Sequence, residues 1–425
     1  MNNQNHESSA LHVTGQAVYI DDIAVDHRLL FGYVYYSPIA HANIVQFDIE
    51  KAKKYPGVFA ILSAQDIPGE NQMGPVIHDQ PALANGKVTC IGEAIFLIAA
   101  ISEEIAREAA KLIEIEYEPL PAILNLEDAI KNKSLLQDPR KIEIGNIKKA
   151  FAESDYIIED TLTTGAQEHW YLETQACLCI PGEENEITAH SSTQNPNETQ
   201  AIISEVLGID KNEVEVICRR MGGAFGGKET EANHVAAWTA LLCKATGRPV
   251  KIKLSRDDDQ IITGKRHPFL IKYKAGFSKQ GKIMALDAEL NSNAGNATDL
   301  SMAILERAML HAENAYFIPN ARIIGKAYRT NLPSNTAYRG FGGPQGMAMI
   351  EHILDKIARK LKKDPLEVRQ NNFYNKQNNL TPYGQIVENN KIPEIYAQII
   401  SKSGYANLRK QTDAFNAKNK YSRQG

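Results

Sequence analysis

Residues 214–245 place a glycine-rich loop between a strand and a helix, and this arrangement limits the possible folds more than any other feature of the sequence. The apolar run Val214–Cys218 predicts a strand, and a helix rich in small residues follows through Ala245. Between them, residues 221–229 read Met-Gly-Gly-Ala-Phe-Gly-Gly-Lys-Glu. Such a loop aims backbone N–H groups at a bound oxyanion. We therefore expect mixed α and β structure around an oxygen-rich ligand.

The same loop also fits the spacing GxxxxGK of a phosphate-binding P-loop, over Gly222–Lys228. A P-loop needs Ser or Thr at the next position to bind magnesium, whereas this chain has Glu229, whose charge would repel a triphosphate. A purely structural turn is a second alternative. We favour a loop that sets backbone donors against a different oxygen-rich centre.

The chain is long enough for two or three globular units. It has 425 residues, of which 43% are hydrophobic. Residues 11–125 mix strands and helices, the polar stretch 126–149 contains the best linker candidate, and residues 150–425 form the second unit. The fold class is therefore α+β, a mixed α/β architecture.

Hydrophobic periodicity and capping residues predict the individual elements. The expected strands are 30–36, 94–100, 112–118, 155–163, 214–218, 269–277 and 282–288. The expected helices begin after Ser102, span 197–207 with Gly208 as the end signal, and follow the glycine-rich loop.

Composition excludes several functional classes. The formal net charge is -4 with dispersed basic residues, which argues against a nucleic-acid partner. No apolar run approaches the roughly 20 residues of a membrane helix, and residues 1–10 lack a leader's apolar core, so we expect no membrane association and a cytoplasmic location. The five cysteines have no zinc or iron–sulfur spacing, and we expect them to be reduced and buried.

Three further motifs are unremarkable when each is taken alone. Residues 334–346 hold four glycines with Arg339 and Phe341, which let backbone approach a ligand but also suit a tight loop. Ser192–Asn195 could be a plain polar turn, and Leu305–Ala308 an ordinary turn of a surface helix.

Together these motifs resemble the molybdenum hydroxylases of the xanthine oxidase family, and within it the molybdopterin-binding part of xanthine dehydrogenases. The strings that carry the resemblance are SSTQN (191–195), RRMGGAFGGKE (219–229), LERAM (305–309) and NLPSNTAYRGFGGPQG (331–346), with HVTGQAVYIDD from His12, GAQEHWYLE from Gly165 and ITGKRHPF from Ile262. The resemblance implies a hammerhead-like α/β domain at 11–125 and a first molybdopterin-binding domain at 150–425.

The resemblance also implies roles for individual residues. Gln194 matches a glutamine that hydrogen-bonds an oxygen ligand of molybdenum, and the backbone amides of Phe225 and Arg339 match donors that face the metal's oxygens. Gly226 belongs to the same cofactor-binding loop. His169 has no second histidine at helical spacing, so we expect a structural histidine.

The substrate side of the resemblance points to a purine. Glu229 and Arg307 match the acid and base that hold the purine and take part in catalysis, and Phe341 matches the ring that stacks on it. A neutral aldehyde would leave both charges unpaired in a dry pocket, which is costly. We therefore expect Glu229 and Arg307 to face one cavity near Phe225 and Gln194. An aldehyde or other N-heterocycle hydroxylase is the alternative.

The implied cofactor is molybdenum–molybdopterin, with 2Fe–2S clusters and FAD on a partner subunit. The implied second molybdopterin-binding domain is missing, so we expect another chain to supply it, or a non-catalytic remnant. Held from one side only, the cofactor should bind weakly to the isolated chain, which we expect to be inactive toward xanthine. The sequence leaves open whether NAD or oxygen accepts the electrons.

Overall fold

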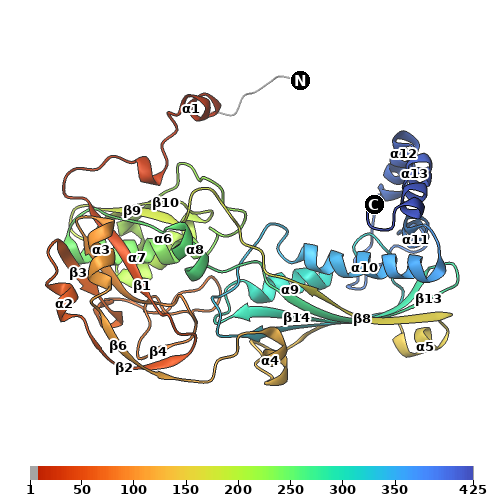
Figure 1. The fold of residues 1–425 in the computed structure, drawn as a ribbon, viewed down its shortest axis with the longest axis horizontal. Coiled ribbons are helices and arrows are strands. Elements are labelled where there is room, and N and C mark those ends of the chain that lie inside the picture. The colour runs from red at the N-terminus through yellow and green to blue at the C-terminus, as the bar shows by residue number, and fades with distance from the viewer. Residues whose placement is uncertain (1–7, 425) are drawn as a thin grey trace.

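The computed structural model describes residues 8–424. Residues 1–7, part of the segment 1–10 considered above, lie outside it. The chain forms two sheets side by side, each covered by helices, and a smaller sheet packs beside the first (Figure 1). The mixed α/β class is therefore confirmed.

Strands from both halves of the sequence build the largest sheet, which has seven strands. In order across the sheet they are β11 (Val214–Ile217), β10 (Ile187–Ser191), β9 (Ala176–Pro181), β12 (Val250–Lys253), β1 (Leu30–Tyr36), β5 (Ala94–Ala100) and β3 (Val58–Leu62). The two halves meet where β1 pairs in parallel with β12, at Leu30 and Val250. The units expected at 11–125 and 150–425 therefore share one sheet, in which β1 lies between β12 and the fully buried strand β5.

Two helices close one core against this sheet. Helix α6 (Pro196–Leu207) starts at the Asn195 cap and ends at Gly208, and α7 (Glu231–Thr246) ends at Gly247; both glycines are left-handed. Residues Glu231–Cys243 of α7 are all buried, which explains why this helix is rich in small residues instead of amphipathic. The helix expected after the glycine-rich loop is thus present, and its first turn lies beside that loop.

The second sheet has five strands and carries its own core. Their order is β7 (Arg140–Ile144), β15 (Ala321–Arg329), β14 (Ile283–Gly295), β13 (Phe269–Phe277) and β8 (Tyr156–Thr164). Helices α9 (Ser301–Leu310) and α10 (Gly343–Leu361) lie along one side of it (Figure 1).

The segment 126–149, expected to be a linker, is built into this second body. It forms α4 (Leu126–Lys131) and β7, and α5 (Ile147–Ala152) begins within it. Strand β7 pairs with β15, and Ile142 and Ile144 pack against the core. Its alternation of isoleucines with charged residues suits an edge strand, and this alternation outweighs the polar composition that suggested a linker.

The remaining elements flank the two sheets. They are β4 (Lys87–Val88), β2 (Ala42–Asp48) and β6 (Glu114–Pro119) in the third sheet, and the helices α1 (Ser9–Thr14), α2 (Glu50–Lys53), α3 (Glu103–Ala110), α8 (Arg256–Ile262), α11 (Pro365–Asn371), α12 (Ile392–Ser403) and α13 (Tyr405–Lys418). The Oγ of Ser102 caps α3 as expected, accepting from Ile105 N at 3.3 Å. Among the described helices, none has the length and apolar character to cross a bilayer. All five cysteines are free.

Candidate functional site

The glycine-rich loop between β11 and α7 is folded so tightly that two of its glycines have no room for a side chain. Gly226 has φ +103°, and a Cβ there would lie 2.6 Å from Ala337 O. A Cβ on Gly227 would lie 2.6 Å from the ring of His169. Phe225, which precedes both glycines, adopts φ 55°, a conformation uncommon for a bulky residue, and the residue is 47% exposed. The loop thus presents Phe225 outward from a closely packed base.

Gln194 holds the loop from the neighbouring segment. Its Oε1 accepts from Gly226 N at 2.9 Å and from Lys228 N at 3.4 Å, and its own backbone N donates to Lys228 O at 2.8 Å. Because Oε1 is used by the loop, the Nε2 group is the end of the carboxamide that remains to donate outward. Gln194 is itself exposed.

The second glycine-rich loop, residues 334–346, is joined directly to the first. Arg339 N donates to Phe225 O at 2.8 Å, and the Arg339 carbonyl accepts from the Arg266 guanidinium at 3.1 Å. This differs from the expectation that the Arg339 amide faces an oxygen ligand, because that amide already serves the loop-to-loop contact. Within the described chain, the N–H of Phe225 donates to no protein acceptor, so this amide stays available to a ligand.

A buried ion pair lies beneath the first loop, and sequence reasoning missed it. The Lys228 side chain is fully buried; its Nζ lies 3.2 Å from Glu173 Oε2 and donates to Ser192 Oγ at 2.8 Å. Glu173 Oε2 also accepts from Gly222 N at 2.8 Å and from Ser192 Oγ at 2.7 Å. Burial lowers the pKa of Lys228, and the neighbouring Glu173 charge opposes that shift.

The direction of Lys228 decides against the P-loop alternative. A P-loop lysine reaches a nucleotide phosphate, whereas this lysine points into the protein and is neutralised there. No sequence spacing signalled the pair, since Glu173 lies 55 positions before Lys228.

His169 contacts both glycine-rich loops on their buried side. Its Nε2 is hydrogen-bonded to Ala337 O at 2.7 Å, and its ring stacks on Tyr338 with centroids 4.8 Å apart. Burial lowers the pKa of His169, which keeps the ring neutral. These contacts are those of a structural histidine, as the sequence indicates.

Glu229 and Arg307 approach this region from different elements. Glu229 follows the first loop and is half-buried; burial first, and the nearby Asp299 charge second, raise its pKa. Arg307 is exposed on α9, and within residues 8–424 its guanidinium forms no ion pair. The second loop packs on the same helix, because a Cβ on Gly342 would lie 2.0 Å from Ile304 O.

The described contacts therefore join Gln194, Gly226, Phe225 and Arg339 into one unit. They do not join Glu229 to Arg307, and the cavity that these two residues are expected to share stays a prediction. Phe341, at φ 47°, donates its N–H to Tyr338 O at 2.7 Å within the second loop.

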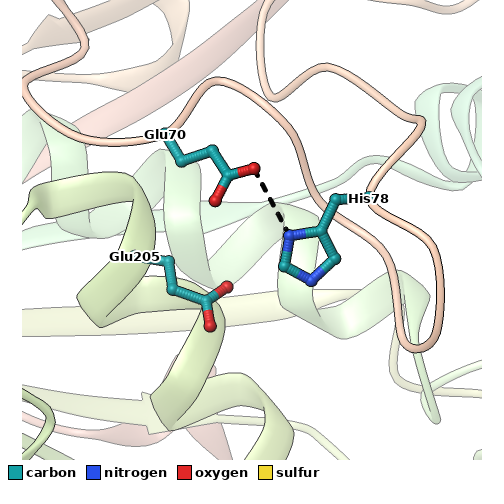
Figure 2. Close-up of side chains that lie close together, drawn as sticks. All are labelled: Glu70, His78 and Glu205. Atoms are coloured by element: carbon teal, nitrogen blue, oxygen red, sulfur yellow. Dashed lines mark ion pairs between the residues drawn. The ribbon is translucent and has the colours of Figure 1, made fainter.

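Elsewhere in the described chain, one group of side chains has metal-ligand spacing. Atoms of Glu70, His78 and Glu205 lie within 4.8 Å of one another, on an exposed surface where a loop meets α6 (Figure 2). His78 Nδ1 lies 3.5 Å from Glu70 Oε1, and these side chains are 35% and 50% exposed. A surface ion pair accounts for that contact.

Comparison with known proteins identifies the class. Residues 127–373 match the molybdopterin cofactor-binding domain family, and residues 14–121 match the a/b hammerhead domain of aldehyde oxidase and xanthine dehydrogenase. The chain belongs to this family of molybdopterin-binding proteins. An aldehyde oxidoreductase from Desulfovibrio gigas has the same fold, with a TM-score of 0.89 and 27% identity, covering 95% of this chain and 46% of that one.

Within the family, the sequence corresponds to the molybdenum-binding portion of xanthine dehydrogenases. It is 44% identical to a xanthine dehydrogenase of Dictyostelium discoideum over 99% of this chain and 31% of that protein. It is 43% identical to the xanthine dehydrogenase/oxidase of Mus musculus over 99% of this chain and 31% of that protein. The chain thus spans about a third of the length of the curated relatives that it matches.

Proposed function

We propose that this chain supplies one wall of a molybdenum-cofactor site at which a purine, hypoxanthine or xanthine, is hydroxylated toward urate in purine catabolism. The observation that carries the proposal is the bond between the two glycine-rich loops at Arg339 N and Phe225 O, beside a carboxamide fixed at Gln194. The two loops direct hydrogen-bond donors outward, and they contain no cluster of His or Cys side chains that could ligate a metal. This suits a cofactor that is held through its oxygens.

The residues present fit such a group. Among residues 8–424 the Gln194 Nε2 and Phe225 N–H donate to no protein acceptor, and Gly226 leaves no Cβ where the loops meet. When bound, the cofactor would supply the oxygen transfer and take up the two electrons of the hydroxylation. Electrons would then leave through 2Fe–2S clusters and FAD on a partner subunit. Another polypeptide segment would carry the second molybdopterin-binding domain.

The remaining roles belong to side chains of this chain. Glu229, whose pKa is raised by burial, would orient the purine ring and exchange a proton with it. Arg307, an exposed guanidinium without an internal partner, would stabilise negative charge developing on the purine oxygen. Phe341 would stack on the purine face.

The proposal is tested by Arg307→Met in the reconstituted holoenzyme that contains the second domain and the redox partner. Loss of this donor should lower purine turnover by about 10²–10³-fold, by analogy with removal of an oxyanion-hole donor. Aldehyde turnover should fall much less, because an aldehyde offers no remote oxygen on which charge develops. Both rates are measured with one artificial electron acceptor.

Glu306→Gln is the matched control. It changes the neighbouring exposed residue of α9 and removes only a surface pair with Arg140, so both rates should stay near wild type. Equal losses for purine and aldehyde in Arg307→Met would contradict a substrate-binding role and would make Arg307 a structural residue.

A further inference from the structure

The ion pair between His78 and Glu70 explains only one contact in the group of side chains that has metal-ligand spacing. Glu70 and His78 lie on a loop of the hammerhead domain, whereas Glu205 lies on α6 of the molybdopterin-binding domain. Both carboxylates extend toward the imidazole (Figure 2). The Glu205 carboxylate takes no part in the ion pair.

The Glu205 carboxylate has no protein partner. Among residues 8–424 neither of its oxygens accepts a hydrogen bond or an ion pair; Oε2 is shielded from solvent, and Oε1 is the accessible oxygen. No described Lys or Arg pairs with Glu70 either. Two carboxylates that lie this close repel each other, and a bound cation would remove the repulsion.

Backbone contacts bring the two carboxylates together, so their proximity does not depend on side-chain rotamers alone. Glu70 N donates to Glu205 O at 2.9 Å, and Gly69 N donates to Val206 O at 3.0 Å. The chains approach so closely that a Cβ on Gly69 would lie 2.0 Å from Glu205 O. The loop and the end of α6 are therefore held against each other.

His78 is fixed in the same loop. Met73 N donates to Gln80 O at 2.7 Å, which closes the segment that contains the histidine. The next residue, Asp79, accepts from Thr298 N at 2.9 Å and from Thr298 Oγ1 at 2.7 Å. Because the segment is already ordered, binding of an ion by His78 would not have to order it.

The separation of His78 Nδ1 and Glu70 Oε1 suits two ligands of one metal ion. At 3.5 Å it is longer than an N–H···O hydrogen bond of about 2.7–3.2 Å. Two ligand atoms of a tetrahedral ion with bonds of about 2.1 Å lie about 3.4 Å apart. The ligand atoms of all three residues lie within 4.8 Å of one another, so a side-chain rotation brings Glu205 to the same ion.

The donor set selects the kind of ion. An imidazole nitrogen beside carboxylate oxygens suits zinc, whereas Mg²⁺ and Ca²⁺ prefer oxygen ligands alone. The two carboxylates balance the charge of a divalent cation, and a neutral imidazole adds none. Three protein ligands leave one position of a tetrahedral zinc ion for water.

We propose that Glu70, His78 and Glu205 bind one zinc ion, with water as the fourth ligand, and that the ion links the hammerhead domain to the molybdopterin-binding domain. None of these residues belongs to the glycine-rich loops, so this inference does not rest on the proposed function. The three ligands meet only in the folded chain, and the ion should therefore stabilise the folded state.

The test is titration calorimetry of the full chain with zinc chloride at neutral pH, after removal of metal with a chelator and in the presence of a reductant. We expect saturable binding of one zinc ion per chain. Mg²⁺ and Ca²⁺ should bind at least about tenfold more weakly, because neither ion favours the imidazole. Thermal unfolding with saturating zinc should give a higher melting temperature than unfolding with chelator.

Two variants from different elements complete the experiment. His78→Gln and Glu205→Gln each remove one ligand and should weaken zinc binding by at least about tenfold, since loss of a group outside the ligand set alone costs about 10–100-fold. Neither side chain forms a hydrogen bond within the described chain, so both variants should fold, which circular dichroism checks. His27→Gln, which changes an exposed histidine of another loop, is the matched control and should bind zinc like wild type.

Three calorimetric results would overturn the proposed zinc site. They are no saturable binding by the wild-type chain, zinc affinity unchanged in both ligand variants, and Mg²⁺ binding as tight as zinc binding. The last two would indicate an adventitious ion only, on an acidic surface. A melting temperature that zinc does not raise in wild type, or that zinc raises equally in His78→Gln, would overturn the link between the domains.

Discussion

Replacing Lys228 with Met tests whether the buried ion pair beneath the first glycine-rich loop holds that loop in place. Methionine has nearly the length of lysine but no charge. After the substitution Glu173 Oε2 keeps the donors Gly222 N and Ser192 Oγ, at 2.8 and 2.7 Å, and loses its counter-charge. Its Oε1 is already buried without a partner. Removing one member of a buried pair costs about 3–5 kcal/mol, so the free energy of unfolding should fall by that amount.

The assay is urea unfolding of the purified chain with linear extrapolation to water. Lys51→Met is the matched control, because the Lys51–Glu114 pair is 66% and 67% exposed and its loss should leave the free energy of unfolding near the wild-type value. The double variant Lys228→Met with Glu173→Gln should be less destabilised than the sum of the single variants, by roughly 1–3 kcal/mol. A Lys228→Met protein as stable as Lys51→Met, with additive single effects, would refute the anchoring argument.

Two further predictions concern the loop and the buried histidines. Gly226→Ala should unfold at a lower temperature than Gly247→Ala: both glycines have positive φ, but only Gly226 would place its Cβ 2.6 Å from a carbonyl oxygen, whereas Gly247 has open space. Equal melting temperatures would contradict the close packing of the loops. Burial lowers the pKa of His234 to about 4 and of His267 to about 3, so between about pH 6.5 and pH 4 the unfolded chain binds these protons and the folded chain largely does not. Stability should therefore decrease by about 2 kcal/mol per histidine from pH 7 to pH 5, measured by urea unfolding; a flat profile would contradict it.

The elements near the cofactor loops could be predicted because local signals and burial agree there. Gly208 ends α6, and a helix of small residues follows the glycine-rich loop as α7, both as the sequence predicts. The pairing of β1 with β12 could not be predicted, since no local signal connects Leu30 with a partner 220 positions away. The linker expectation rested on polar composition, and it missed β7 because only two isoleucines of that strand face the core.

In the candidate site, too, some residues could be predicted from their local sequence, whereas the positions of others depend on tertiary contacts. Phe225 and Gly226 lie in a glycine-rich motif that already signals close backbone approach, and the structure brings Gln194 against it. Lys228 belongs to the same motif, yet its direction depends on Glu173 across the fold. The Arg339 amide differs from expectation for the same reason, because its acceptor is Phe225 O on the other loop.

Within residues 8–424 no ion pair joins Glu229 to Arg307, which bears on what each side chain can do. An ion pair between them would neutralise both groups and would leave neither available to a bound molecule. Arg307 is exposed and has no ion-pair partner among the described residues, so its guanidinium donors stay free of them. Glu229 faces the opposite constraint, because burial and the Asp299 charge make its proton harder to lose. Because they are not paired with each other, the Arg307 guanidinium and the Glu229 carboxyl can each hydrogen-bond a different atom of one ligand. Two side chains in direct contact could not, because each would already be hydrogen-bonded to the other before the ligand bound.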